Sequence, residues 1–191
     1  MITKKDIIIS LVNKDKLIEA LKILNETYVN IHTIEDKNKY KNIVWELLQL
    51  SYADIEGGYK GANSVEELIE KTSSWKLVKR SNRIVCGVLY KSKYGKKLVA
   101  LFSDGTNAGK IELKKIIEDE IALKRSWIEC SGKVELIYNR RGGVPIPNTI
   151  AKEILESMNK EIVSLSDDGF HYKRFIGGKL FEKIMFGNVQ N

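Results

Sequence analysis

Cysteine, proline and histidine are all scarce in this chain. Its 191 residues include two cysteines, two prolines and two histidines. Cys86 and Cys130 each stand in an apolar run, so we expect two buried thiols and no disulfide framework. His32 and His171 belong to no CxxC or HExxH spacing, and the sequence therefore predicts no metal site.

Long apolar runs are also missing. The chain has no stretch of about 18 consecutive apolar residues, so we expect no segment that spans a membrane. The apolar stretch near the N-terminus is followed by Asp15 and Lys16, which makes it a poor signal peptide. These absences predict a cytoplasmic protein.

The charge of the chain is unbalanced toward the positive. There are 32 lysines and arginines against 25 acidic residues, a formal net charge of +7. Such a charge favours anionic partners, such as nucleotide phosphates or nucleic acid. The basic residues are spread along the chain, however, which is also typical of a solvated, lysine-rich surface. Apolar residues make up 43% of the sequence, which is ordinary for one globular domain, with or without an appendage.

The hydrophobic pattern predicts helices in the first part of the chain and mainly strands after Trp75. Residues 14–28 have apolar residues at helical spacing, so we expect an N-terminal helical extension over residues 1–28 and a single domain over 29–191. Ser64 and Glu67 form a capping-box pattern at the start of a short helix. The predicted helices cover residues 38–54, 65–73, 110–123, 132–140 and a segment after Pro147 that Asn148 would cap, and the predicted strands cover 29–34, 76–80, 83–90, 97–103, 126–130, 161–165, 171–176 and 180–186, with a Gly177-Gly178 turn before the last strand.

The segment from Lys97 to Leu123 reads as a strand, a glycine-containing loop and a helix. The first N–H groups of a helix have no partners within it, and they attract anions together with the helix dipole. Gly105 and Gly109 would let the backbone approach a ligand, and Lys110 and Lys114 could add positive charge. An ordinary strand-to-helix turn would use the same residues. The spacing matches neither a P-loop nor a dinucleotide fingerprint.

The order of these elements over residues 29–187 resembles the GCN5-related N-acetyltransferase (GNAT) superfamily. The resemblance implies an α+β fold with a mixed, mainly antiparallel sheet flanked by helices, here with an extra N-terminal helix. It also implies that strands 97–103 and 126–130 are neighbours that splay apart at one end, where acetyl-CoA binds as co-substrate without a metal. In that family a Q/R-x-x-G-x-G/A loop holds the CoA pyrophosphate. Its counterpart is Thr106–Ile111, in which Gly109 matches the pattern.

The same resemblance implies the site residues. Tyr138 lies in Val134–Gly142, which resembles the family's LYxxxG segment, and it would protonate the departing CoA thiolate. Glu129 and Asp104 lie at or near strand ends beside the implied cofactor cleft, and of the two Glu129 is the candidate general base, because alternation turns it to one face of its strand. The alternatives are a packing tyrosine and a solvent-facing glutamate. The implied cofactor-binding residues are Phe102, Ser103, Gly105, Thr106, Asn107, Ala108, Gly109 and Lys110.

A second resemblance is carried by the segments beginning at Trp75, Ser103, Pro145 and Asp168. These are similar to an uncharacterised family common in bacteriophage genomes, which implies a phage or prophage setting.

Three functional hypotheses follow. The first is an acetyl-CoA-dependent N-acetyltransferase, for which the sequence does not fix the amine acceptor and leaves protein and RNA as candidates. The second is a non-catalytic protein of the same fold that binds a host or phage protein or nucleic acid. The third is direct nucleic-acid binding through the basic strand residues Lys91, Lys93, Lys96, Lys97, Lys173 and Arg174. The oligomeric state stays open.

Overall fold

The strands form one continuous sheet. The computed structural model describes residues 28–55, 58–167 and 170–189. Its eight strands have the order β1-β2-β3-β4-β5-β8-β7-β6. The strands are β1 (Tyr28–Ile31), β2 (Ser74–Arg80), β3 (Arg83–Ser92), β4 (Lys96–Ser103), β5 (Ser126–Cys130), β6 (Ser164–Leu165), β7 (His171–Ile176) and β8 (Lys179–Gly187), and the helices are α3 (Ile34–Ser51), α4 (Val65–Lys71), α5 (Asn107–Leu123), α6 (Gly132–Arg140) and α7 (Asn148–Ser157).

Hairpins build both halves of this sheet. Strands β2, β3 and β4 form an antiparallel meander. Ser81 and Asn82 both have positive φ in the β2–β3 turn, a conformation that asparagine tolerates better than most residues. Gly177 and Gly178 have φ of 56° and 77° between β7 and β8, as expected for a two-residue hairpin turn. The predicted closing hairpin is therefore confirmed.

One pair of strands differs from the rest. β4 and β5 are parallel neighbours, paired through Lys96↔Ser126, Lys97↔Trp127 and Leu98↔Ile128. All other neighbouring strands in the sheet are antiparallel. The predicted α+β class and mixed, mainly antiparallel sheet are confirmed, and so is the prediction that strands 97–103 and 126–130 are neighbours.

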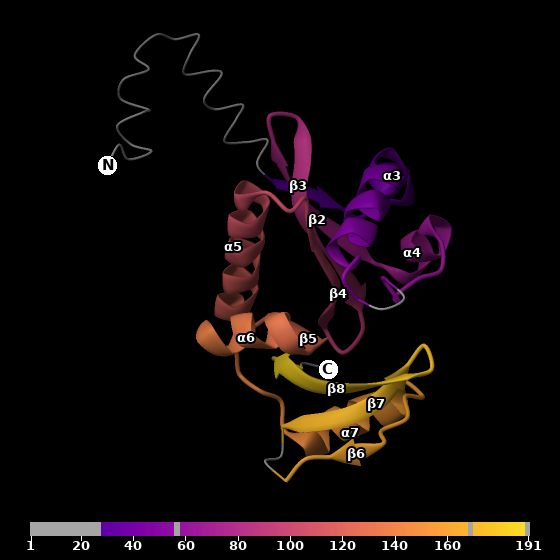
Figure 1. The fold of residues 1–191 in the computed structure, drawn as a ribbon, viewed down its shortest axis with the longest axis vertical. Helices are drawn as coiled ribbons and strands as arrows, with labels where there is room; N and C mark the ends of the chain where they lie inside the picture. The colour runs from indigo at the N-terminus through magenta and orange to yellow at the C-terminus, as the bar shows by residue number, and fades with distance from the viewer. Residues whose placement is uncertain (1–27, 56–57, 168–169, 190–191) are drawn as a thin grey trace, which may run out of the picture.

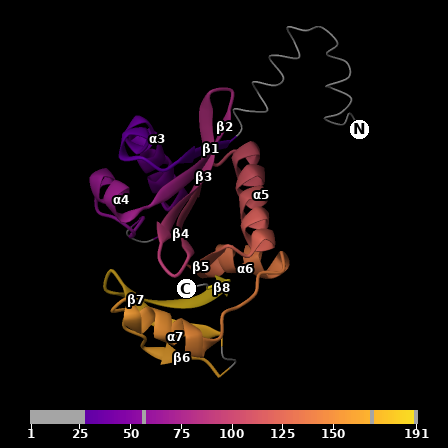
Figure 2. The ribbon, with the colours of Figure 1, turned by 180° about the vertical axis from the view of Figure 1, so that it is seen from behind.

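The helices cover both faces of the sheet. Figures 1 and 2 show α5 on one side of β2–β4 and α3 and α4 on the other. Ile116 and Ile117 of α5 pack in one core cluster with Leu98 and Ile128, which also contains Tyr138 of α6. Val44 and Leu48 of α3 and Leu68 of α4 pack on the opposite face with Leu77, Leu89 and Phe102. α7 covers that same opposite face beyond β4, where Ala151, Ile154 and Leu155 pack with Trp127, Tyr172 and Met185.

Side-chain caps explain where several helices begin. Thr33 accepts a hydrogen bond from the N–H of Asp36, so α3 begins four residues before the prediction. Ser64 caps α4 as predicted, at 3.2 Å from the N–H of Glu67. The prediction that Asn148 caps α7 is wrong. Asn148 is the first residue of the helix, and its amide donates to the carbonyl of His171 in β7.

The predicted N-terminal helix falls almost entirely on residues that the structure does not describe. The predicted helix 14–28, and with it the predicted N-terminal extension, lies outside the described residues apart from Tyr28, which begins β1.

In the part of the chain that the structure describes, every helix is too short or too polar to cross a membrane.

Candidate active site

The sheet opens where β4 and β5 stop pairing. Their register ends at Leu98 and Ile128, although β4 continues to Ser103 and β5 to Cys130. Asp104 donates its N–H to Val85 of β3 at 2.8 Å. Because neighbouring residues of a strand direct their backbone groups to opposite edges, the N–H and carbonyl of Ser103 face the diverging side. The middle of the sheet thus contains a strand edge that β5 does not cover.

Side chains from the end of α3 reach this edge. The Ser51 hydroxyl accepts from the N–H of Ser103 at 3.0 Å and donates to its carbonyl oxygen at 2.9 Å. Burial raises the pKa of Tyr52, against the smaller effect of a hydrogen bond from the backbone of Leu101. Tyr52 also packs edge-on against Tyr59, with ring centroids 5.2 Å apart. Tyr52 and Tyr59 therefore lie beside the open edge.

The loop after β4 leads directly into the N-terminus of α5. Thr106 caps the helix, and its hydroxyl accepts from the N–H of Gly109 at 3.1 Å. Within the described residues, the N–H groups of Asn107 and Ala108 form no hydrogen bond. Both residues are exposed, as is Lys110 one turn later. Two free N–H groups at the positive end of a 17-residue helix fit an anionic ligand.

Asp104 opposes an anion at this position. Its carboxylate accepts from the N–H of Thr106 at 3.0 Å and from its hydroxyl at 2.6 Å. The side chain is only 3% exposed, and its nearest cation is Arg83 at 3.5 Å. A pyrophosphate bound at Asn107 and Ala108 would therefore lie beside a fixed negative charge.

The two loop glycines serve different purposes. Gly105 has φ of +81°, which a residue with a side chain adopts only with strain. A Cβ at Gly109 would lie 2.4 Å from Asp104 Oδ1 and 2.5 Å from the carbonyl oxygen of Val85. Gly109 thus allows α5 to approach β3 closely, whether or not a ligand binds.

The remaining predicted cofactor residues divide into exposed and buried groups. Phe102 is 1% exposed and packs in the core under α3 and α4, so only its backbone could reach a ligand. Ser103 is partly exposed and bonded to Ser51. Gly105 and Thr106 are exposed with the first residues of α5. The structure brings this set together at one end of α5.

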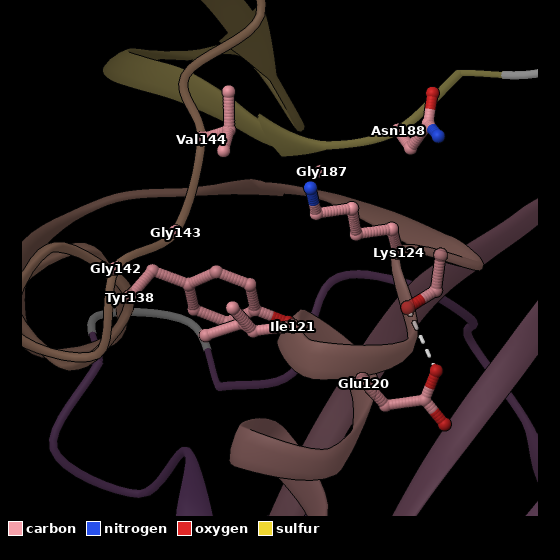
Figure 3. A pocket seen from close by; sticks show the side chains of 10 residues that line it. Glu120, Ile121, Lys124, Tyr138, Gly142, Gly143, Val144, Gly187 and Asn188 are labelled. Atoms are coloured by element: carbon pink, nitrogen blue, oxygen red, sulfur yellow. Dashed lines mark hydrogen bonds between the residues drawn. The ribbon is translucent and has the colours of Figure 1, made fainter.

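Tyr138 lies toward the other end of α5. It is 3% exposed and stacks on Phe186, with ring centroids 5.4 Å apart. Burial raises the pKa of the phenol, so it is neutral at pH 7. Its hydroxyl forms no hydrogen bond with any described residue. The ring lines a pocket of about 200 Å³ (Figure 3), which is formed by Glu120, Ile121, Lys124, Ser126, Tyr138, Gly142, Gly143, Val144, Gly187 and Asn188.

Glu120 is the acidic residue of this pocket, and sequence reasoning missed it. Its side chain is 5% exposed and accepts hydrogen bonds from the hydroxyls of Tyr90 and Ser126, each at 2.7 Å. Burial alone would raise its pKa, but these hydrogen bonds and Lys96 outweigh burial and hold the pKa below its ordinary value. A signal was available, since Glu120 follows Ile116 and Ile117 at helical spacing and so falls on the apolar face.

Glu129 occupies the opposite face of β5 from Tyr138. Ile128 and Cys130 pack in the cluster under α5 and α6, so alternation directs Glu129 away from it. Its carboxylate lies 3.4 Å from Lys97 Nζ and 2.5 Å from Arg174 Nε. Burial opposes ionisation, but the two cations outweigh it and lower the pKa of Glu129. A carboxylate held in this form is a weak proton acceptor.

The two cysteines and His171 of β7 are further side chains with reactive or titratable groups. Cys86 and Cys130 are both buried and free, as predicted, and burial raises the pKa of each thiol to about 12. His171 Nε2 lies 3.3 Å from Glu135 Oε1 of α6. His171 therefore contacts α6, the helix that also contains Tyr138.

The loop at the start of α5 and the pocket that Tyr138 lines are separated by most of the length of α5. Gly109 and Glu120 are 11 residues apart, which corresponds to about 17 Å along a helix that rises 1.5 Å per residue. In acetyl-CoA the pyrophosphate and the thioester sulfur stand at opposite ends of the long pantetheine arm. A ligand of that form could contact the start of α5 and the vicinity of Tyr138 together.

Comparisons with known proteins give structural similarity only. No family model and no curated protein sequence matches the chain. A probable acetyltransferase from Staphylococcus epidermidis has 15% identity and a TM-score of 0.44, over 83% of this chain and 96% of that one. The aminoglycoside 6'-N-acetyltransferase from Enterococcus faecium has 13% identity and a TM-score of 0.42, over 84% and 96%. The ribosomal-protein-S18-alanine N-acetyltransferase from Escherichia coli has 10% identity and a TM-score of 0.41, over 86% and 95%.

Proposed function

We propose that this protein is an acetyl-CoA-dependent N-acetyltransferase of the GNAT type, as its resemblance at the level of element order implies. The observation that carries the proposal is the divergence of β4 from β5 in the middle of the sheet, after only three paired positions. The edge there would offer backbone N–H and carbonyl groups to the amides of a pantetheine arm once Ser51, which is bonded to both backbone groups of Ser103, moves away. The free N–H groups at the start of α5 would hold the pyrophosphate.

In the proposed reaction, the amine nitrogen attacks the thioester carbonyl carbon and the C–S bond breaks. Tyr138 donates its phenolic proton to the departing sulfur, the attacking nitrogen loses one proton to water, and the Tyr138 phenolate then takes a proton back from water. The products are an amide and CoA thiol. Of the two predicted catalytic residues, the geometry favours Tyr138, because its hydroxyl is neutral and has no partner among the described residues. Positioning of the two reactants would supply most of the remaining acceleration.

A second function is favoured by two particular contacts. Ser51 occupies the backbone groups of Ser103, and Asp104 places a carboxylate at the start of α5. Both contacts oppose cofactor binding. They support the alternative of a non-catalytic protein with this fold that binds a host or phage macromolecule.

A titration with acetyl-CoA separates these functions. A ligand that binds only the folded protein should add about 2.7 kcal/mol of stability at 100 times its Kd, measurable as a thermal shift. Absence of a shift at millimolar acetyl-CoA would reject the acetyltransferase and favour the alternative.

The variant Asp104→Asn tests where the pyrophosphate binds. The amide keeps an oxygen to accept from Thr106 but removes the charge. Unit charges roughly 6 Å apart in water interact by about 0.7 kcal/mol, so affinity for acetyl-CoA should rise about threefold or more. Asp119→Asn, at an exposed position on α5, is the matched control for net charge. Equal affinities for both variants would place the pyrophosphate elsewhere.

A further inference from the structure

Three cationic side chains surround one carboxylate on the face of the sheet that α7 covers. Lys97 of β4 and Arg174 of β7 both contact Glu129 of β5, at 3.4 and 2.5 Å. Lys183 of β8 lies close enough to Glu129 and Arg174 to interact electrostatically with both, and its Nζ is 3.4 Å from the hydroxyl of Ser131. The side chains of Lys97, Arg174 and Glu129 are 15%, 11% and 4% exposed. The cluster is therefore largely removed from water.

The charges of this cluster do not balance. Three cations and one carboxylate leave a formal charge of +2. Among the described residues, Glu129 is the one carboxylate within 4 Å of any of the three cations. Burying unpaired charge is costly, and accordingly burial lowers the pKa of both Lys97 and Lys183 despite the attraction of Glu129. An added anion would compensate this charge.

A buried hydrogen-bond donor beside the cluster also lacks a partner. Tyr172 is paired with Lys183 across β7 and β8, so the two side chains share one face. Tyr172 is 1% exposed, and its hydroxyl is buried without a hydrogen bond. The phenol lies near enough to Glu129 and Arg174 for both to affect its pKa, which burial mainly raises. Since buried hydroxyls normally have partners, Tyr172 points to a missing acceptor.

We propose that Lys97, Arg174, Lys183 and the Tyr172 hydroxyl bind an anionic group, a carboxylate or phosphate, carried by the acceptor amine. Lys97 and Glu129 flank the point where β4 and β5 diverge, on the face opposite Tyr138. The anion site stands on the cluster alone, whereas its role in acceptor recognition rests on the proposed acetyltransferase function. An acidic amino acid or a phosphorylated amine fits a site of charge +2, and the same charge repels polyamines.

Isothermal titration with inorganic phosphate and with glutarate, at ionic strength held constant with NaCl, tests the anion site. Lys183→Gln should weaken binding about tenfold or more, because it removes a charged hydrogen-bond donor. Tyr172→Phe should weaken binding severalfold with the fold intact. Lys173→Gln is the matched control, since it removes the same charge from the adjacent, exposed position on the other face of β7. Absence of anion binding by the native protein, or equal weakening by Lys183→Gln and Lys173→Gln, overturns the site.

The acceptor role needs a second measurement. Acetyl-CoA affinity is measured on the same samples, and transfer is compared for glutamate, O-phosphoserine and spermidine. We expect the two acidic amines to be acetylated faster than spermidine, and Lys183→Gln to reduce that preference about tenfold. Preference for spermidine overturns the acceptor assignment. Acetyl-CoA binding without phosphate or glutarate binding overturns this inference alone, whereas anion binding without acetyl-CoA binding refutes the proposed function and leaves only the anion site.

Discussion

The hydroxyls of Tyr138 and Tyr90 allow one sharp comparison, because both rings are buried under α5 and only one hydroxyl has a partner. The Tyr90 hydroxyl donates to Glu120 at 2.7 Å, in a site where that carboxylate is 5% exposed. The Tyr138 hydroxyl forms no hydrogen bond with the described residues, and its ring lines the pocket. Replacing each tyrosine by phenylalanine removes one oxygen and keeps the ring.

The expected stabilities follow from what each hydroxyl does. Tyr90→Phe removes a hydrogen bond to a buried charge and should lower the free energy of unfolding by about 1.5–3 kcal/mol. Tyr138→Phe removes no hydrogen bond and keeps the stacking on Phe186, so the change should be below about 0.5 kcal/mol. If Tyr138 is the general acid, the same substitution should lower kcat by about 10²–10⁴-fold with little change in acetyl-CoA affinity.

Urea unfolding at pH 7 measures the stabilities, and release of CoA thiol measures turnover. Slow hydrolysis of acetyl-CoA can stand in for transfer until an acceptor is known. A loss above 1 kcal/mol in Tyr138→Phe would show that its hydroxyl has a structural partner. Full turnover in a stable Tyr138→Phe protein would reduce this tyrosine to a packing residue.

Two further predictions concern Gly109 and Glu129. Gly109→Ala should lower the free energy of unfolding by about 1–3 kcal/mol, because its Cβ would lie 2.5 Å from the Val85 carbonyl oxygen. Urea unfolding measures this change, and a loss below about 0.5 kcal/mol would contradict the close approach of α5 to β3. The lowered pKa of Glu129 contributes stability that is fully present above the unfolded pKa of about 4.3 and is lost as pH falls through the lower folded pKa. Unfolding free energies between pH 7 and 3 should therefore decline less steeply in Glu129→Gln than in the exposed control Glu153→Gln, and equal slopes would refute this.

Local sequence patterns predicted most element types and several bounds. Strand 126–130, helix 132–140 and strand 171–176 have the predicted limits. Their alternating or helical apolar spacing, and the Gly177-Gly178 turn, depend on residues only a few positions apart. Helix starts were less well predicted, because the caps at Thr33 and Thr106 lie outside the apolar repeat.

Local patterns therefore account for the set of elements, their order and the polar residues on each. The folded chain adds the separation of β4 from β5 after Leu98, the contact of Asp104 with the Thr106 N–H before α5, and the hydrogen bond from Tyr90 to Glu120. It also brought Lys97, Glu129 and Arg174 together, although they are 32 and 45 residues apart along the chain. Such contacts depend on how strands pair and which face each side chain takes, and a one-residue change of register would reverse every face.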